Sequence, residues 1–271
     1  MNGRLLSKCT ARLASVRKVM VLAPLGAFAV FFLLAAAAAQ NISSREVLWQ
    51  VVNAMCIPDQ VLNQNPAPCV RVDLQGGTER GFAILKDQNG ATQYLLVPTV
   101  RISGIESPLV LAPGAPNYFA TAWEARTYVN DALHRTLPRD DLSLAVNSAM
   151  SRSQDSLHIH IDCVRSDVAE ALHKYQDQIG SQWAPFPPSF FGHHYLAMWV
   201  PGEKLDANPF RLLADRLPGA RQDMGDHTLV VVGLTRRDGT KGFVLLEDQV
   251  DKPADMAGGE ELQDHTCGIA R

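Results

Sequence analysis

LHIHIDC, residues 157–163, decides the fold, because its apolar and polar residues alternate strictly. Such alternation predicts a β-strand, in which residues two apart share one face of a sheet. The apolar face is expected to enter a core and consists of Leu157, Ile159 and Ile161. The opposite face carries four polar side chains, Ser156, His158, His160 and Asp162. Upstream, the apolar run 142–147 predicts a second strand that pairs with this one.

Two further pairs of predicted strands are joined by turn sequences. Residues 81–86 and 93–97 flank Asp87-Gln88-Asn89-Gly90, and residues 228–234 and 242–246 flank Asp238-Gly239. Asn-Gly and Asp-Gly supply the positive φ that tight hairpins need. Because the clearest links between strands are hairpins, the sequence predicts an α+β fold with an antiparallel sheet.

The other periodic segments complete the predicted fold. Helical spacing of apolar residues predicts a helix that begins near Ser43 and reaches Met55, and further helices over 117–135, 167–179 and 209–216. A short strand is expected over 195–200. Proline-rich stretches predict loops over 57–68 and 183–191. The helix-and-hairpin order of the first half recurs loosely in residues 167–271, which suggests an internal pseudo-repeat.

Composition sets the broad class of the protein. The chain has 271 residues, 46% hydrophobic and 20% charged, so it can bury a core and is not disordered throughout. This length suits one large domain or two small ones. The 25 basic and 28 acidic residues give a net charge of −3. There is no basic excess of the kind that indicates a nucleic acid partner.

The charge is unevenly distributed along the chain. Residues 1–40 contain five basic residues and no acidic one, which leaves 20 basic and 28 acidic residues, a net charge of −8, in 41–271. The basic run precedes Val19–Ala39, an uncharged stretch of 21 residues. As a helix it would be long enough to span a bilayer, so we expect a membrane anchor. The alternative is a signal peptide cleaved before Gln40. Both interpretations predict that residues 41–271 are exported.

Four cysteines lie in the part that is expected to be exported, where disulfides form: Cys56, Cys69, Cys163 and Cys267. They allow three pairings. Prolines between the first two favour a turning chain that brings its own ends together. The sequence therefore predicts the disulfides Cys56–Cys69 and Cys163–Cys267, with four separate buried thiols as the alternative.

The spacing of His158 and His160 leaves three interpretations open. Two imidazoles on one strand can hydrogen-bond within the sheet, bind a metal, or act as a nucleophile and a proton donor. A zinc site would need a third ligand, for which the sequence offers His193, His194, His227 or His265. The spacing alone does not choose among these interpretations.

The surrounding residues resemble a known signature. In 147–161, a loop rich in small residues leads into the histidine strand, as in the histidine-triad superfamily, whose strand carries His-x-His-x-His. Several segments resemble, more specifically, the membrane-anchored CDP-diacylglycerol pyrophosphatases of bacteria. They are residues 63–66, 68–69, 86–90, 93–98, 105–108 and 263–267, together with the N-terminal apolar segment.

This resemblance implies a histidine-triad-like catalytic domain over 41–271 and a substrate, CDP-diacylglycerol, that lies in a membrane. It implies hydrolysis to CMP and phosphatidate through a histidine-bound CMP, without a metal or other cofactor. His158 would be the nucleophile and His160 its partner, while Ser156 replaces the first histidine of the triad. The expected location is the bacterial inner membrane, with the catalytic domain in the periplasm.

An anionic substrate needs hydrogen-bond donors and local positive charge in a domain of charge −8. The sequence offers Asn147, Ser153, Gln154 and Ser156 as polar contacts, and Arg152, Arg101 and Lys86 as cations. Because Ser156 cannot titrate near neutrality, a second hypothesis is a catalytically weak nucleotide- or lipid-binding protein. A periplasmic metal-binding protein using His158 and His160 is the third.

Overall fold

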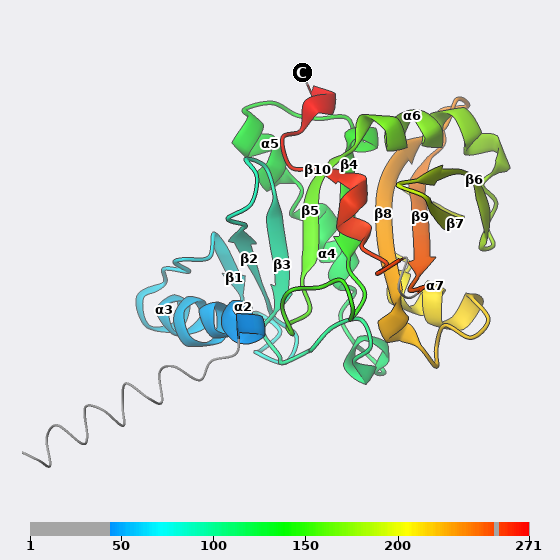
Figure 1. Cartoon of the computed structure of the whole chain (residues 1–271). Helices are drawn as coiled ribbons and strands as arrows, with labels where there is room; N and C mark the ends of the chain where they lie inside the picture. The colour runs from blue at the N-terminus through cyan, green and yellow to red at the C-terminus, as the bar shows by residue number, and fades with distance from the viewer. Residues whose placement is uncertain (1–43, 252–254, 271) are drawn as a thin grey trace, which may run out of the picture. The chain divides into compact units, whose positions relative to one another are not determined.

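The computed structural model describes residues 44–251 and 255–270. Within them, ten strands form one sheet in the order β1-β2-β3-β5-β4-β8-β9-β7-β6, with β10 paired to β5 (Figure 1). Every pairing is antiparallel. The predicted α+β class with an antiparallel sheet is therefore confirmed. Both halves of the chain contribute to this sheet and join where β4 pairs with β8.

The strands are β1 (Arg71–Asp73), β2 (Phe82–Lys86), β3 (Tyr94–Pro98), β4 (Leu142–Val146), β5 (Ile159–Val164), β6 (Ala184–Phe190), β7 (His193–Pro201), β8 (His227–Thr235), β9 (Lys241–Gln249) and β10 (Gln263–Asp264). The helices are α2 (Val47–Gln50), α3 (Ile57–Asn63), α4 (Tyr118–Glu124), α5 (Thr127–Leu133), α6 (Ser166–Tyr175) and α7 (Pro209–Arg216). A π-helical stretch, η2 (Val51–Cys56), joins α2 to α3.

The histidine strand is central, because β5 pairs with β4 on one side and with β3 and β10 on the other. The pairing of the two predicted strands is confirmed, with Ala145 opposite His160. The regular strand starts at Ile159, so His158 lies immediately ahead of it. Leu157, Ile159 and Ile161 belong to the largest apolar core, as the alternation predicts.

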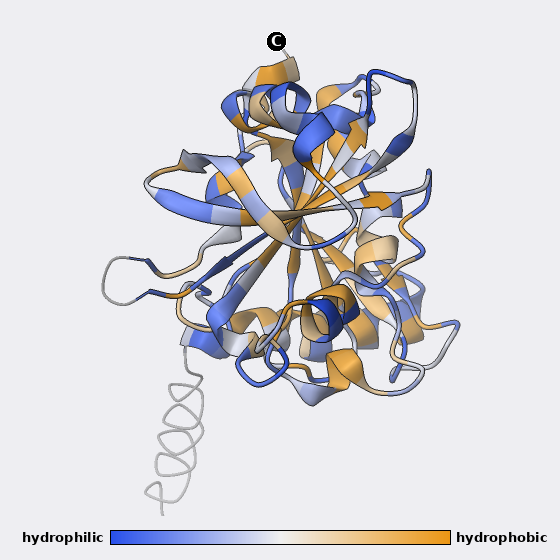
Figure 2. Ribbon diagram, turned by 90° about the vertical axis from the view of Figure 1, so that its right-hand side faces the viewer, coloured by the Kyte–Doolittle hydropathy of each residue, from blue (hydrophilic) through white to orange (hydrophobic). Residues whose placement is uncertain are grey.

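That core lies between one face of the sheet and three helices, α4, α5 and α7. Its largest side chains include Phe119 and Trp123 of α4 and Phe210 of α7, all almost fully buried. Trp123 meets Phe243 of β9 edge-on, with ring centroids 4.9 Å apart. Figure 2 shows hydrophobic residues gathered in the central strands and on the helices beside them. Each such side chain stabilises the fold by roughly 1.5–3 kcal/mol through burial.

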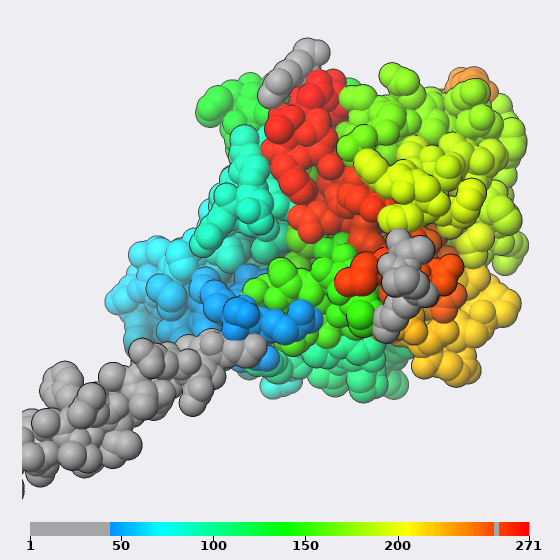
Figure 3. Space-filling model, viewed as in Figure 1, coloured from blue at the N-terminus to red at the C-terminus, as the bar shows by residue number. Residues whose placement is uncertain are grey.

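The opposite face of the sheet carries two separate apolar clusters. In the first, Val52 and Cys56 of η2 pack with residues of β2 and β3. In the second, Val168 and Leu172 of α6 pack with residues of β4, β8 and β9. His160 and Asp162 of β5 lie on this face. The C-terminal segment, red in Figures 1 and 3, crosses it from Asp255 to Ala270. This segment covers a polar strip in an otherwise apolar face.

Two predicted loops contain regular structure, and one predicted helix is divided. Residues 57–63 form α3, which carries Pro58 in its first turn, where the missing N–H breaks no helical bond. Residues 184–190 form β6, an edge strand with an irregular pairing between Pro185 and Ser189, and both features let a strand accept prolines. The predicted helix 117–135 is interrupted after Glu124 and resumes at Thr127.

Both predicted disulfides are confirmed. Cys56 pairs with Cys69 and Cys163 pairs with Cys267, with Cα atoms 5.6 and 5.2 Å apart. The predicted membrane span or signal, Val19–Ala39, lies outside the described residues. Among residues 44–251 and 255–270, no helix combines the length and apolar character needed to cross a bilayer.

Candidate active site

His158 is held in one tautomer by the backbone beside it. Its Nδ1 lies 2.6 Å from the carbonyl oxygen of Ser156, which can only accept, so Nδ1 carries the proton. Nε2 then keeps its lone pair. The residue is 7% exposed. Burial lowers the pKa of His158 below its usual value, and the charges of Glu260 and Arg152 act on it in opposite directions. The ring is therefore neutral at pH 7.

His160 has the complementary tautomer. Its Nδ1 lies 2.8 Å from Nε2 of Gln93, which can only donate, so the proton of His160 is on Nε2. The same amide nitrogen donates to Glu260 at 2.8 Å, which fixes the orientation of Gln93. Burial, and then the nearby ring of His158, lower the pKa of His160 to about 3. The two imidazole rings meet edge-on, with centroids 4.8 Å apart.

The Nε2–H of His160 is an unpaired donor. The atom is buried and makes no hydrogen bond to any residue in the described part of the chain. A buried polar group without a partner costs about 1–3 kcal/mol. Such a group beside a second imidazole with a free lone pair is an arrangement that can bind an oxyanion and attack it. One ring supplies the nucleophilic nitrogen and the other a proton.

Glu260 connects the C-terminal segment to this pair. It lies in η7 (Gly259–Leu262), and its Oε2 accepts from Nδ2 of Asn147 at 3.2 Å, while its own N–H donates back to Oδ1 of Asn147 at 3.1 Å. Although burial opposes ionisation, hydrogen bonds from His265, Gln93 and Asn147 hold the pKa of Glu260 well below its usual range. Asn147, a predicted substrate contact, is thus fixed beside the histidines.

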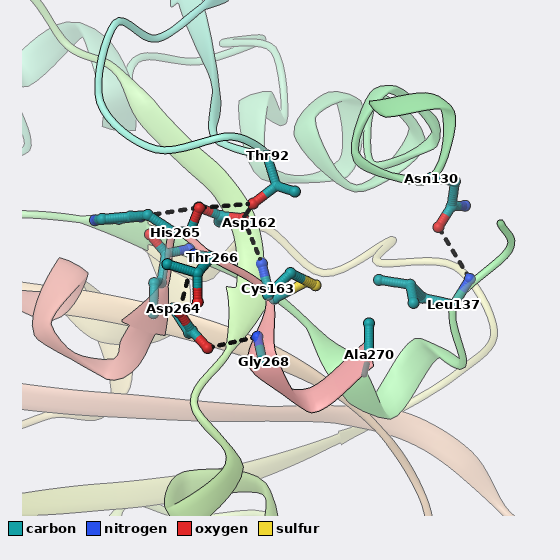
Figure 4. The surroundings of a disulfide bond; sticks show 12 residues. Thr92, Asn130, Leu137, Asp162, Cys163, Asp264, His265, Thr266, Gly268 and Ala270 are labelled. Atoms are coloured by element: carbon teal, nitrogen blue, oxygen red, sulfur yellow. Dashed lines mark hydrogen bonds and ion pairs between the residues drawn. A yellow bond between two sulfur atoms is a disulfide. The ribbon is translucent and has the colours of Figure 1, made fainter. Parts of the chain in front are cut away.

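Asp162 and His265 form the next part of the network (Figure 4). Oδ2 of Asp162 lies 2.8 Å from Nδ1 of His265, and its Oδ1 accepts from the Thr92 hydroxyl at 2.6 Å. Nε2 of His265 lies 3.3 Å from Glu260. These two carboxylates raise the pKa of His265 to about 10. His265 is therefore an imidazolium at neutral pH, and Asp162 orients it.

A glycine lets the first hairpin pack against this imidazolium. Gly90 has a φ of +69°, and a Cβ there would lie 2.4 Å from Cβ of His265. Asn89-Gly90 therefore serves both the tight turn and the close approach of the turn to His265. The residues that follow it, Thr92 and Gln93, carry the hydrogen bonds to Asp162 and His160.

The loop between β4 and β5 contains the predicted substrate contacts Arg152, Ser153 and Gln154. Two of them bond to other protein groups, and the third is exposed. The guanidinium of Arg152 pairs with Glu106 at 2.5 Å and with Asp155 at 3.1 Å, so its charge is neutralised. Gln154 accepts from the N–H of Leu48 at 2.9 Å, and Arg45 pairs with Asp155. Ser153 is exposed. These bonds attach the loop ahead of His158 to the start of α2.

The other two predicted cations, Arg101 and Lys86, have different kinds of partner. Arg101 pairs with Glu46, and its guanidinium lies over the ring of Trp49. Neither partner belongs to the histidine network. Nζ of Lys86 donates to the carbonyl oxygens of Asp87 at 2.9 Å and Gly90 at 3.1 Å. Of the three, only Lys86 has no carboxylate partner among the described residues, but its ammonium lies over the ring of Tyr94, on the face of the sheet that packs against α5 and not on the face of His160.

Sequence reasoning missed Gln93, Thr92 and Glu260. Gln93 stands in one of the segments that carry the family resemblance, so a signal existed for it. Glu260 follows a Gly-Gly pair in an acidic stretch that reads as an ordinary solvated turn. Its position depends on Gly259, where a Cβ would lie 2.4 Å from Oγ1 of Thr228 and 2.7 Å from Val230. Glycine allows η7 to rest directly on β8.

Three of the four histidines considered as a third zinc ligand have carboxylate partners of their own, and the fourth, His194, is exposed. His193 pairs with Glu261 at 2.8 Å. His227 lies between Glu247 and Asp223, and His265 between Asp162 and Glu260. His265 is thus the one whose hydrogen-bond network reaches His160.

The raised pKa of His265 predicts a loss of stability at alkaline pH. Its stabilising contribution is complete below about pH 6.5, the pKa of an unfolded histidine, and declines as pH rises to about 10. His265→Gln lacks this contribution. Because the side chain is 30% exposed, we expect wild type to exceed the variant by about 2 kcal/mol at pH 6, and by much less at pH 10. Urea unfolding at both pH values measures the difference, and a constant difference contradicts it.

Comparison with known proteins shows the family to which the chain belongs. A family model described as CDP-diacylglycerol pyrophosphatase matches residues 43–271. A CDP-diacylglycerol pyrophosphatase of Yersinia pestis is 42% identical over 229 residues, which cover 84% of this chain and 86% of that protein. The family match includes all the residues of the network described above.

Proposed function

Because the chain belongs to the CDP-diacylglycerol pyrophosphatase family, a family of hydrolases that act on anhydrides, we propose that it cleaves CDP-diacylglycerol to CMP and phosphatidate, through a CMP bound to His158. The observation that carries the mechanism is the pair of contacts from Nδ1 of His158 to the Ser156 carbonyl oxygen and from Nδ1 of His160 to Nε2 of Gln93, which together imply opposite tautomers. The reaction is a step of phospholipid metabolism.

His158 acts as the nucleophile. Its free Nε2 attacks the α-phosphorus of the cytidylyl group, and the bond to the phosphatidate oxygen breaks. The Ser156 carbonyl keeps the ring oriented at 2.6 Å and stabilises the positive charge that the ring gains when its second nitrogen bonds phosphorus. Water then attacks the same phosphorus, releases CMP and restores neutral His158.

His160 acts as the donor. Its unpaired Nε2–H offers a hydrogen bond to a phosphoryl oxygen or to the departing phosphatidate oxygen, which develops charge in the transition state. Gln93 and Glu260 keep the proton on that nitrogen, since Nδ1 is already an acceptor. The side chain works as a hydrogen-bond donor without needing to ionise, because its pKa is about 3.

Lys86 is the one of the three sequence candidates whose positive charge remains available to the diphosphate, although it starts from the opposite face of the sheet from His160. Arg152 and Arg101 are already paired with carboxylates, whereas the ammonium of Lys86 bonds only to carbonyl oxygens among the described residues. A diphosphate can replace these weak partners. Local charge is needed because the exported part carries a net charge of −8.

Lys86→Met is expected to lower kcat/KM for CDP-diacylglycerol by about 10–100-fold, the equivalent of one charged hydrogen bond. Lys174→Met is a matched control, since both ammonium groups lie over a tyrosine ring, at 5.5 Å for Lys86 and 5.0 Å for Lys174. The control should retain wild-type kcat/KM. Equal activities of the two variants would remove Lys86 from the site.

The acyl chains of the substrate lie in the membrane, so the enzyme must reach the substrate at the membrane surface. We propose that residues 19–39 form an uncleaved span of the bacterial inner membrane, with residues 41–271 in the periplasm. The described chain begins with a helical stretch whose α3 exposes Val61 and Leu62 at 63% and 78%. Exposed apolar side chains next in sequence to an apolar segment suit a lipid surface. The same helical stretch bonds to the loop that leads into His158.

Ser156 favours a second candidate function, a weak nucleotide- or lipid-binding protein of the same family. Its carbonyl oxygen holds His158, but its side chain cannot supply a titrating group. The two functions predict different outcomes with cytidine nucleotides, since a binding protein would bind them without turnover.

The purified full-length chain in detergent should be given CDP-diacylglycerol and, separately, cytidine diphosphate esters without acyl chains. We expect equal amounts of CMP and phosphatidate from the lipid. With labelled cytidine and an alkaline quench, which preserves phosphorus–nitrogen bonds, label should remain on the protein. Binding measured by calorimetry without CMP release would select the weak binding protein. Absence of both would exclude the two candidates together.

A further inference from the structure

A second cluster of ionisable side chains includes the first described residue of the C-terminal segment. It consists of His193 at the start of β7, Asp248 near the end of β9, and Asp255, which begins the C-terminal segment. One ligand atom from each of the three lies within 4.8 Å of the others. None of these residues has a part in the proposed hydrolysis.

Two of the three side chains are carboxylates removed from water. Asp248 is 6% exposed and Asp255 is 8% exposed. Oδ2 of Asp248 is buried and makes no hydrogen bond to any residue in 44–251 or 255–270. Burial, and then the Asp255 carboxylate, raise the pKa of Asp248 to about 8. Two buried carboxylates this close require either a shared proton or a cation between them.

The protein supplies little positive charge to this cluster. Among the described residues, only His193 lies within ion-pair distance, 3.5 Å from Oδ2 of Asp255. Its Nδ1 is closer to a third carboxylate, Glu261, at 2.8 Å. Glu261 also accepts from the Tyr195 hydroxyl at 2.6 Å. One imidazole thus faces three carboxylates, and the unpaired Oδ2 of Asp248 points to a missing cation.

We propose that His193, Asp248 and Asp255 bind one divalent metal ion. An imidazole nitrogen with carboxylate oxygens is a donor set that suits Zn²⁺ or Mn²⁺ better than Mg²⁺ or Ca²⁺, which prefer oxygen alone. Ligand atoms of one zinc ion lie at most about 4.4 Å apart, twice the longest bond, so a small inward movement closes the site. Of the three residues, Asp248 also lines a cavity of about 330 Å³.

The ion would fasten the C-terminal segment to the sheet. Asp255 and Glu261 come from that segment, whereas His193 and Asp248 come from β7 and β9. Glu260, next to Glu261, bonds Gln93 and Asn147 in the active site. Glu261 orients His193, as carboxylates orient metal-bound imidazoles elsewhere. The ligands would therefore hold Glu260 in position. The proposed metal site does not depend on which substrate the protein cleaves.

The test uses the full chain without an affinity tag, because a polyhistidine tag binds zinc. The protein in detergent is treated with EDTA, desalted and titrated with ZnCl₂, MnCl₂ and CaCl₂ by calorimetry. We expect one Zn²⁺ per chain and a higher melting temperature with zinc. Asp248→Asn and His193→Gln should each weaken zinc binding by at least about 10-fold, the effect of changing even an outer-shell residue. Glu170→Gln, on the exposed side of α6, should bind as wild type does.

Three results would overturn the proposal. Wild type that binds no Zn²⁺ or Mn²⁺ saturably would mean that Asp248 and Asp255 share a proton instead of an ion. Zinc binding that is unchanged in both Asp248→Asn and His193→Gln would place the ion elsewhere. Binding that survives in both but is lost in His158→Ala would place it at the active site. His193 is at the surface end of β7, so His193→Gln keeps the test valid if Asp248→Asn does not fold.

Discussion

His158→Ala is expected to lower the release of CMP from CDP-diacylglycerol by at least about 10⁴-fold. A side chain that bonds covalently to the reacting phosphorus has no substitute, and removing a catalytic nucleophile costs 10⁴–10⁶ in kcat in other hydrolases. The variant should also lose the cytidine label that remains on the wild-type protein after an alkaline quench. KM for the lipid should change little, since the attack contributes to the transition state and not to substrate binding.

The control for this variant is His173→Ala. His173 is exposed on α6, where its imidazole lies 3.4 Å from Asp140, and it should retain wild-type turnover. Thermal unfolding of both variants checks that the loss at His158 is chemical, because a buried imidazole also fills space. Turnover of His158→Ala within tenfold of wild type would show that another group attacks phosphorus.

Replacing both Cys163 and Cys267 with serine is expected to lower the free energy of unfolding by about 4–5 kcal/mol. The disulfide closes a loop over a sequence separation of 104 residues, and the entropy that a cross-link removes from the unfolded chain grows with the loop. A domain whose total stability is about 5–15 kcal/mol loses much of its margin. Urea unfolding under non-reducing conditions measures the change.

The second disulfide is the matched control for this prediction. Cys56 and Cys69 are separated by 13 residues, so Cys56→Ser with Cys69→Ser should cost about 3 kcal/mol. Activity should separate the pairs further. Cys163 donates its N–H to Asp162, and Cys267 is two residues from His265 (Figure 4). Equal losses of stability and activity in the two double variants would contradict both the loop-length argument and the link to His265.

The histidine strand and the first hairpin could be predicted because their signals are local. The alternation around Ile159 and Ile161 depends only on the period of a strand, and Asn89-Gly90 only on backbone sterics. The prediction of one continuous helix over 117–135 was wrong, because two helices, α4 and α5, form there. The prediction of a loop over 183–191 was wrong, because these residues contain β6. In β6 the prolines indicate a loop locally, but an edge position in the sheet accepts them.

The candidate site divides in the same way. His158 and His160 share a face because they are two residues apart, and this much follows from the sequence. Their tautomers do not follow from it, since they depend on a carbonyl oxygen and on Gln93, 67 residues from His160. Arg152 is next to the histidine strand in sequence and resembles a phosphate ligand, yet Glu106 and Asp155 neutralise it. Whether a charged side chain is available to a substrate depends on the residues around it in space.

The sequence by itself determined the α+β class, the paired strands around the histidines, both disulfides and, through resemblance, the family. Most of these properties depend on periodicity, on turn residues and on motifs that each lie within a short stretch of chain, while Cys163–Cys267 followed as the pair that remained after the local pair Cys56–Cys69. Only the tertiary structure decided that Glu260 joins His160 to His265, that Lys86 keeps its charge, and that His193, Asp248 and Asp255 meet. Such contacts join residues as far apart as 167 positions, and hydrogen bonding and electrostatics depend on distance in space.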